Sequence, residues 1–198
     1  MKKLSESVWM DIHKRSNGEA ARREDPLECA FIKAKEMELI DVTSSMHSGR
    51  KTLWTPCNLG AESYDEPGLW LDYNQIAELH SMLKNTGYYI ASSFDWDGLR
   101  TVYGKSVKIK DKTYGFLFAD KLYIPNFGYM SSLDKPLFTK RNDGGVYGSV
   151  QYDNPAYTVF HFTMDKSTYK INQFRPATTT NDPDSTDKFQ VRLVKRVS

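Results

Sequence analysis

The sequence FQVRLVK, residues 189–195, alternates apolar and polar side chains near the end of the chain. Successive residues of a strand point to opposite faces of a sheet, so Phe189, Val191 and Leu193 fall on one face. Gln190 and Arg192 fall on the other. The pattern predicts a half-buried strand whose three apolar residues face the core.

The segments before this strand are also rich in aromatic and β-branched residues between turn residues, which is typical of strands. Aromatic residues make up 13% of the chain, a composition that favours β structure over a helical bundle. Expected strands are MELIDV (37–42), KTLWTPC (51–57), YYIA (88–91), SVKIK (106–110), TYGFLF (113–118), KLYIP (121–125), YTVFHFT (157–163) and YKINQF (169–174).

Two helices are expected among the early strands. One covers residues 94–103, where Ser92-Ser93 provides a cap and Gly104 a stop. Two helices followed by irregular β structure with long loops predict an α+β fold class. The other helix covers residues 73–85 and carries an apolar face of Ile76, Leu79 and Leu83, with His80 beside them.

Charge and cysteine content exclude several classes of protein. The 198 residues include 27 basic and 25 acidic ones, and a net charge of +2 creates no field that would attract nucleic acid. No apolar stretch is long enough to insert in a membrane. Cys29 and Cys57 match neither a disulfide framework nor a zinc spacing, so no metal site and no cofactor is expected.

The amino-terminal residues predict a separate attachment segment. Leu4, Val8 and Ile12 recur every four residues with Trp9 beside them, as on one face of an amphipathic helix over 3–15. A single helix of this length is marginal in water, so it needs another surface to lie on. Residues 1–25 are therefore expected to form a leader, 26–36 a linker with a short helix capped by Asp25, and 37–198 the main domain.

Five blocks within residues 37–198 occur in a recognisable order. They are LWTPCNLGAES (53–63), NTGYYIASSFDWDGLRTVYG (85–104), GFLFADKLYIPNFGYM (115–130), YGSVQYDNPAYTVFHFTMD (147–165) and FQVRLVK (189–195). Together they resemble the Fibrobacter-type major paralogous domain, which is similar to the formylglycine-generating-enzyme-like branch of the C-type lectin fold. The resemblance implies a C-type-lectin-like domain with two helices and a mostly antiparallel, irregular sheet. It also implies that the closing strand lies near residues 37–42.

The leader shows a second resemblance. MKKLSESVW, followed by a charged segment that ends in RRED, resembles the short leader of virion proteins in Bacteroides phages, including crAss-like phages. This resemblance implies that residues 1–25 bind other virion proteins. It places the chain in the virion, assembled in the cytoplasm of the bacterial host, as a homo-oligomer.

The polar and aromatic YDNPAY segment (152–157) is expected to form a loop. Tyrosine in a loop is a rigid recognition residue with a hydroxyl for hydrogen bonding. On lectin-type folds the binding face combines loops of this region with the last long loop, here residues 175–187. The implied ligand-binding residues are Tyr152, Asp153, Asn154 and Tyr157 with Thr179, Asn181 and Asp182. The alternative is that both loops pack on a neighbouring virion subunit.

Oxygen side chains flank a proline in Asp153-Asn154-Pro155 and in Asn181-Asp182-Pro183-Asp184. Calcium binds such oxygen ligands. Short Asx-Pro segments are also ordinary turn chemistry, and we interpret both as turns.

An enzymatic function is not expected. Formylglycine chemistry would need a reactive cysteine pair late in the domain, and no cysteine follows Cys57, which is interpreted as a small buried hydrophobe. His161 has no partner at ligand spacing and is interpreted as a sheet residue. The leading hypothesis is a phage virion structural protein that displays a lectin-like domain to a host-surface glycan or protein. A capsid, tail or head-fibre assembly subunit without a host ligand and a bacterial surface adhesin are the alternatives.

Overall fold

The computed structural model describes residues 25–42, 51–99, 102–109, 112–125, 129–130, 136–137, 146–151, 154–164, 169–174 and 188–197. Side chains are described over 25–42, 51–92, 94–96, 98–99, 102–107, 115–125 and 188–197. The expected leader helix and its residues Leu4, Val8, Trp9 and Ile12 lie outside these ranges.

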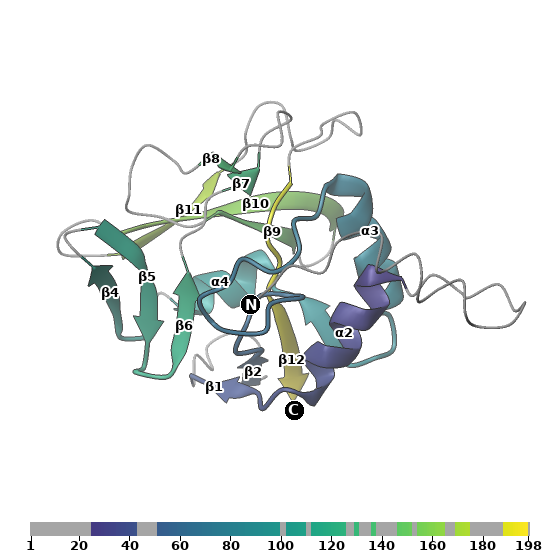
Figure 1. Ribbon diagram of the computed structural model, residues 1–198, viewed down its shortest axis with the longest axis horizontal. Coiled ribbons are helices and arrows are strands. Elements are labelled where there is room, and N and C mark those ends of the chain that lie inside the picture. Colours follow the sequence, from purple (N-terminus) through teal and green to yellow (C-terminus); the bar gives the residue numbers. More distant parts are fainter. Residues whose placement is uncertain are drawn as a thin grey trace, which may run out of the picture.

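The main sheet has four antiparallel strands in the order β1-β2-β12-β3, so the closing strand β12 lies inside it (Figure 1). Val194 of β12 pairs with Trp54 on one side and with Tyr89 on the other. As expected, residues 37–42 and the closing strand contribute to the same sheet. Strand β2 lies between β1 and β12. The strands are β1 (Ile40–Asp41), β2 (Lys51–Trp54), β3 (Tyr88–Ile90) and β12 (Leu193–Val197).

Three smaller antiparallel sheets complete the β structure. They have the orders β4-β5-β6, β11-β10-β9 and β7-β8. The chain is thus an α+β protein with antiparallel sheets, as the sequence predicts at this level. The strands are β4 (Gly104–Ile109), β5 (Lys112–Phe118), β6 (Leu122–Pro125), β7 (Tyr129–Met130), β8 (Pro136–Leu137), β9 (Val146–Gln151), β10 (Asn154–Met164) and β11 (Tyr169–Phe174).

The described helices begin at side-chain caps. Helix α2 (Pro26–Glu36) begins after Asp25, whose carboxylate accepts a hydrogen bond from the Leu27 backbone N–H at 2.9 Å. Helix α3 (Tyr73–Met82) begins with a reciprocal capping box between Asp72 and Gln75. Both starts satisfy backbone donors that a helix end leaves unpaired.

Helix α4 (Ser93–Gly98) is shorter than the predicted span of 94–103. Its predicted cap is confirmed, since Ser92 and Asp95 exchange hydrogen bonds. The predicted stop is wrong, because Gly104 begins β4. Gly98 already ends the helix, as expected for a residue that weakens helical backbone.

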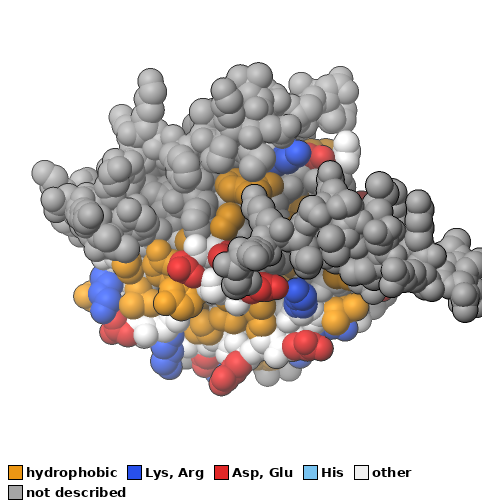
Figure 2. Space-filling view, in the orientation of Figure 1, with side chains coloured by type: hydrophobic (Ala, Val, Ile, Leu, Met, Phe, Trp, Pro, Cys, Tyr) orange, Lys and Arg blue, Asp and Glu red, His pale blue; other side chains and the backbone are white. Residues whose placement is uncertain are grey.

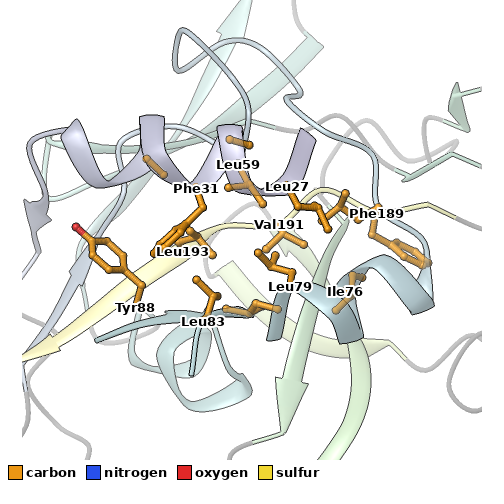
Figure 3. Packing of buried hydrophobic residues seen from close by; sticks show 14 residues of the cluster. Leu27, Phe31, Leu59, Ile76, Leu79, Leu83, Tyr88, Phe189, Val191 and Leu193 are labelled. Carbon is orange, nitrogen blue, oxygen red and sulfur yellow. The ribbon is translucent and has the colours of Figure 1, made fainter. Parts of the chain in front are cut away.

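Two hydrophobic cores lie on opposite faces of the main sheet. On one face, residues of α2 and α3 pack with Phe189, Val191 and Leu193, which the close-up shows between the two helices (Figure 3). On the other face, Trp54 and Val194 pack with Trp96 of α4 and with the inner side chains of β5 and β6. The prediction that the three apolar residues of the closing segment face the core is therefore confirmed.

The prediction that this segment is only half-buried is wrong. Gln190 and Arg192 are as inaccessible as Val191 between them, at 0% exposure. The reason is that both faces of the segment are covered. The Arg192 guanidinium donates to the carbonyl oxygens of Thr55 and Tyr123 at 3.0 and 3.1 Å, so polar partners stand where solvent was expected.

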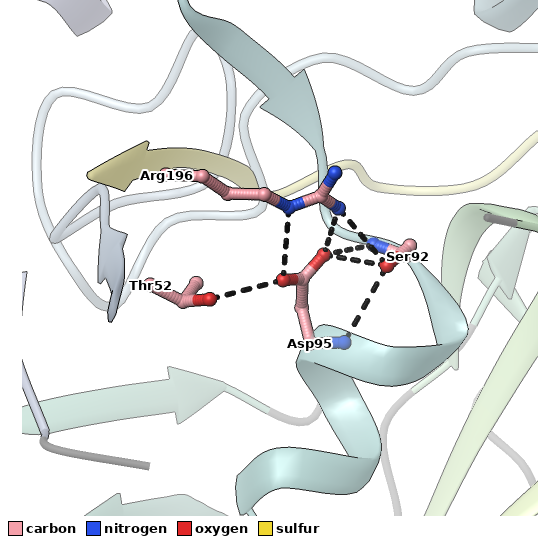
Figure 4. Close-up of polar contacts among 4 residues, drawn as sticks. All are labelled: Thr52, Ser92, Asp95 and Arg196. Carbon is pink, nitrogen blue, oxygen red and sulfur yellow. Dashed lines mark hydrogen bonds and ion pairs between the residues drawn. The ribbon is translucent and has the colours of Figure 1, made fainter. Parts of the chain in front are cut away.

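An ion pair fastens β12 to the start of α4 (Figure 4). Arg196 donates through Nη2 to Asp95 at 2.7 Å and to the Ser92 hydroxyl at 3.1 Å. Thr52 of β2 donates to the other Asp95 oxygen at 3.2 Å. The Asp95 carboxylate therefore joins the last strand, the second strand and a helix cap.

Candidate functional site

The structure places the sequence-predicted ligand residues only in part. Tyr152, Asp153, Thr179, Asn181 and Asp182 lie outside the described residues. The nearness of the two predicted loops therefore stays a prediction.

Asn154 and Tyr157, predicted in a loop, belong to strand β10, so that part of the prediction is wrong. The pairing with β9 extends beyond the apolar pattern, to Gln151 opposite Asn154. The register shifts between Asn154 and Tyr157, where Pro155 stands. A bulge is one of the few sheet positions that tolerate proline, because proline lacks the backbone N–H of the ladder.

A groove of about 760 Å³ runs beside the edge strand β1. Residues 37–41, Glu62 and Lys121 line it. Pro56 and Cys57 also line it. The lining combines apolar side chains with three carboxylates and one ammonium.

The segment that carries Pro56 and Cys57 is fixed to the closing segment on both sides. Thr55 N–H donates to the Leu193 carbonyl at 3.1 Å, and Leu59 N–H donates to the Val191 carbonyl at 2.9 Å. The Thr55 hydroxyl reaches the Leu193 oxygen as well, at 3.0 Å. This part of the groove is therefore anchored to the closing segment, whose residues 190–194 are all buried.

The turn after this segment is closed by the Glu66 carboxylate. It accepts the backbone N–H groups of Glu62 and Ser63 at 2.9 and 3.3 Å, and the Ser63 hydroxyl donates to Asp65 at 2.7 Å. Tyr64 stands at the tip of this turn with 60% of its surface exposed. A large apolar ring is thus held in solvent by a turn whose polar groups are satisfied.

Tyr64 packs edge-to-face on Tyr123 of β6, with ring centroids 5.6 Å apart. The Tyr123 ring covers Gly115, because a Cβ atom at Gly115 would lie 2.7 Å from it. Only glycine leaves room for the ring on this face of the sheet. Figure 2 shows hydrophobic side chains gathered over the β4-β5-β6 side of the molecule, with acidic and basic groups at their margins.

Lysine partners neutralise two of the carboxylates in the groove wall. Lys51 pairs with Asp41, and Lys33 pairs with Glu62 at 3.3 Å. Three of the four charged residues in the described lining are nevertheless acidic: Glu38, Asp41 and Glu62, against Lys121. With Lys33 and Lys51 counted, three acidic and three basic groups balance at the groove, so neither an anionic nor a cationic ligand meets a net attraction.

The Cys57 thiol is buried, in agreement with its interpretation as a small hydrophobe. Burial raises the pKa of Cys57, Arg192 opposes that rise, and Glu66 and Asp65 add to it. The protonated thiol therefore dominates at neutral pH and is a poor nucleophile. His80 is half-buried on α3, and burial together with Lys84 lowers its pKa.

Within the described residues, no three histidine, cysteine or acidic side chains are grouped to hold a metal ion. None of the described helices is long and apolar enough to cross a bilayer. Comparison with protein-family models finds no match, and comparisons with curated proteins and with solved structures find none either.

The groove was not anticipated from the sequence. Its lining comes from residues 37–41, 56–57, 62 and 121, and no pattern along the chain shows that they meet. The one local signal is AESYDEPG (61–68), where a tyrosine stands among acidic residues just before a Pro-Gly turn.

Proposed function

We propose that this chain is a non-enzymatic structural protein of a phage virion. Residues 1–25 attach it to other virion proteins, and a lectin-like domain is displayed for binding to a host-surface glycan or protein. It assembles in the bacterial cytoplasm and acts as a homo-oligomer in the particle. A purely structural assembly subunit is the second candidate, and a bacterial surface adhesin the third.

The observation that carries the proposal is the place of β12 inside the main sheet. The first and last strands of the domain share this sheet, and α3, α4 and the smaller antiparallel sheets lie between them in the chain. A lectin-like domain is expected to be closed in this way by its last strand. The five motif blocks of the sequence support the same assignment.

The chemistry of Cys57 supports a binding role over formylglycine chemistry. That reaction needs reactive thiols, whereas the Cys57 thiol is buried and its pKa is raised. The sequence holds no cysteine beyond it.

Attachment is tested by deleting residues 1–20 and by Trp9→Ala. Loss of a buried interface tryptophan costs on the order of 2–4 kcal/mol in binding, so both variants are expected to be depleted from purified virions. Lys14→Ala in the same segment is the control and is expected to be incorporated normally. Full incorporation of the deletion variant would refute the leader as an anchor.

Host binding is tested with the full chain on a glycan array and on host cells. Tyr152→Ala together with Tyr157→Ala is expected to weaken binding if the predicted loop face is the site. A chain that incorporates into virions but binds neither glycans nor cells would leave the assembly subunit as the better description.

A further inference from the structure

We propose that the groove beside β1, together with the exposed ring of Tyr64, binds a neutral oligosaccharide. The site consists of residues 37–41, Cys57, Glu62, Lys121 and Tyr64 and is separate from the predicted loop residues. Binding of a neutral oligosaccharide at this groove does not require that the protein be attached to a virion. It shares with the proposed function only the idea that the domain binds a glycan.

Close neighbours in the chain connect the groove to the tyrosine pair. Glu62 of the groove wall and Tyr64 belong to the same turn, and Lys121 of the groove directly precedes β6, which carries Tyr123. Lys121 and Tyr123 are two residues apart at the start of β6 and are therefore separated by roughly 6–7 Å. The ring pair therefore stands at the end of the groove, within reach of the same elongated ligand.

Volume and shape agree with a ligand of a few rings. The groove measures about 760 Å³, within the range of roughly 300–1,000 Å³ found for small-ligand sites. It is open to solvent rather than enclosed. An open groove suits a chain-like ligand that continues beyond the site on both sides.

The Tyr64 ring suits the C–H face of a sugar. An aromatic ring carries a negative face that attracts partially positive C–H groups, and 60% of Tyr64 is exposed to make such a contact. Its packing on Tyr123 and the closed turn hold the ring in place before binding. Little side-chain entropy is then lost when a ligand stacks on it.

Charge decides between a neutral glycan and other occupants. The balance of three acidic and three basic groups gives a sialylated or phosphorylated chain no net attraction. Asp41 and Glu62 already have lysine partners, so a basic peptide would have to displace Lys51 and Lys33. A sugar hydroxyl needs no such exchange, because each paired carboxylate keeps lone pairs that can still accept a hydrogen bond.

The test uses the full chain and a panel of immobilised oligosaccharides. The panel comprises neutral glycans ending in galactose, mannose or N-acetylglucosamine, a sialylated glycan, and an oligolysine peptide. Neutral glycans that bind are then titrated in solution against four proteins: the unchanged chain, Tyr64→Ala, Tyr64→Phe and Tyr103→Ala. Tyr103 is a matched control, since it is 71% exposed and directly precedes β4, the strand at the other edge of the β4-β5-β6 sheet.

We expect at least one neutral glycan to bind, and Tyr64→Ala to weaken its affinity at least tenfold. Tyr64→Phe keeps the ring and should stay within about threefold, and Tyr103→Ala should bind as the unchanged chain does. Thermal melts of all variants confirm that they are folded.

Three results would overturn the inference. One is the absence of binding to every neutral glycan. Another is binding that Tyr64→Ala leaves intact and that Tyr152→Ala with Tyr157→Ala abolishes, in which case the proposed function stands and its site is the loop face. The third is Tyr64-dependent binding of the oligolysine peptide alone, which would make the groove a peptide site.

Discussion

At the scale of single residues, two glycines with positive φ make a matched pair. Gly68 has φ +73° and Gly87 has φ +81°. A Cβ atom at Gly68 would lie 2.4 Å from the Leu59 carbonyl oxygen, whereas nothing lies within 4 Å of one at Gly87. Both positions need a left-handed backbone, but only Gly68 also lacks space for a Cβ atom.

Gly87→Ala should therefore destabilise the protein by about 1 kcal/mol, the penalty of a left-handed backbone for a residue with a side chain. Gly68→Ala should lose a further 1–3 kcal/mol or so, because backbone must move to relieve the contact. Urea unfolding of both variants measures the difference. Equal losses of stability in the two variants would mean that the turn at Gly68 makes room for the methyl group at no cost in free energy.

Cys57 leads to a prediction about pH. Its folded-state pKa is raised, chiefly by burial, so the folded protein holds the thiol proton at pH values where the unfolded chain has released it. The associated stability is complete below the unfolded pKa of about 8.5 and is lost as pH rises from there through the folded pKa. Urea unfolding between pH 7 and 10 should show a smaller decline for Cys57→Ala than for the unchanged chain.

Cys29→Ala is the control for this measurement, since Cys29 is only partly buried on α2. It should keep the full decline. Iodoacetamide at pH 7.5 should likewise label Cys29 of the folded protein well before Cys57. Fast labelling of Cys57 without unfolding would contradict its burial.

At the scale of elements, α2 is a structural part of the domain. Leu27, Ala30, Phe31 and Ala34 are buried in the core that also holds the closing segment. Phe31 meets Tyr88 edge-to-face with ring centroids 5.6 Å apart. A fragment that starts at Met37 would lack this layer, so a domain for experiments should begin at or before Asp25.

Neighbouring residues of α2 test this role. Phe31→Ala should cost roughly 3–5 kcal/mol, because it leaves a cavity in the core. Ile32→Ala, at a position 45% exposed on the same helix, should stay within about 0.5 kcal/mol. Chemical denaturation measures both. A small loss of stability in Phe31→Ala would indicate that α2 is a linker and not part of the folded domain.

The ion pair between β12 and α4 makes a second prediction at this scale. Asp95 and Arg196 side chains are 4% and 16% exposed, so Arg196→Met leaves a largely buried carboxylate without its cation. Breaking such a pair from one side typically costs about 3–5 kcal/mol, which denaturation should detect. Lys105→Met is the control, because it breaks an exposed pair with Asp120 and should leave stability unchanged. An equally small effect at Arg196 would show that the retained Ser92 and Thr52 bonds suffice for Asp95.

Helix starts and buried faces were predictable from sequence because their causes are local. Asp25 and Ser92 cap the residues that follow them, and Ile76, Leu79 and Leu83 recur at helical spacing and are buried. Strand limits were less predictable, since a strand ends where its partner ends. The predicted strand over 37–42 pairs only at Ile40–Asp41, while β10 continues past its apolar pattern to Asn154.

At the scale of the whole molecule, the closing segment serves both cores. Phe189, Val191 and Leu193 pack on the helical side of the sheet, and Val194 packs on the other. The alternating sequence anticipated only the first of these contacts, because alternation cannot show that the second face is also covered. Burial of Arg192 depends on Thr55 and Tyr123, which are distant in the sequence, and so could not be anticipated either.

Truncation after Lys188 should abolish cooperative unfolding, because it removes the strand between β2 and β3 and exposes both cores. Removing Ser198 alone is the control and should leave the thermal transition unchanged. Differential scanning calorimetry distinguishes the two outcomes. A truncated chain that kept a sharp transition would show that the rest of the sheet closes without β12.

The central position of β12 also bears on how the chain is made. Trp54 and its neighbours leave the ribosome long before the strand that pairs with them, and translation proceeds at roughly 5–20 residues per second. For several seconds the nascent chain therefore carries an incomplete sheet with an open slot and two uncovered apolar faces. During that interval a chaperone, or a strand from another nascent copy on the same polysome, could fill the slot, so misassembly should be sensitive to the speed of translation over residues 55–192.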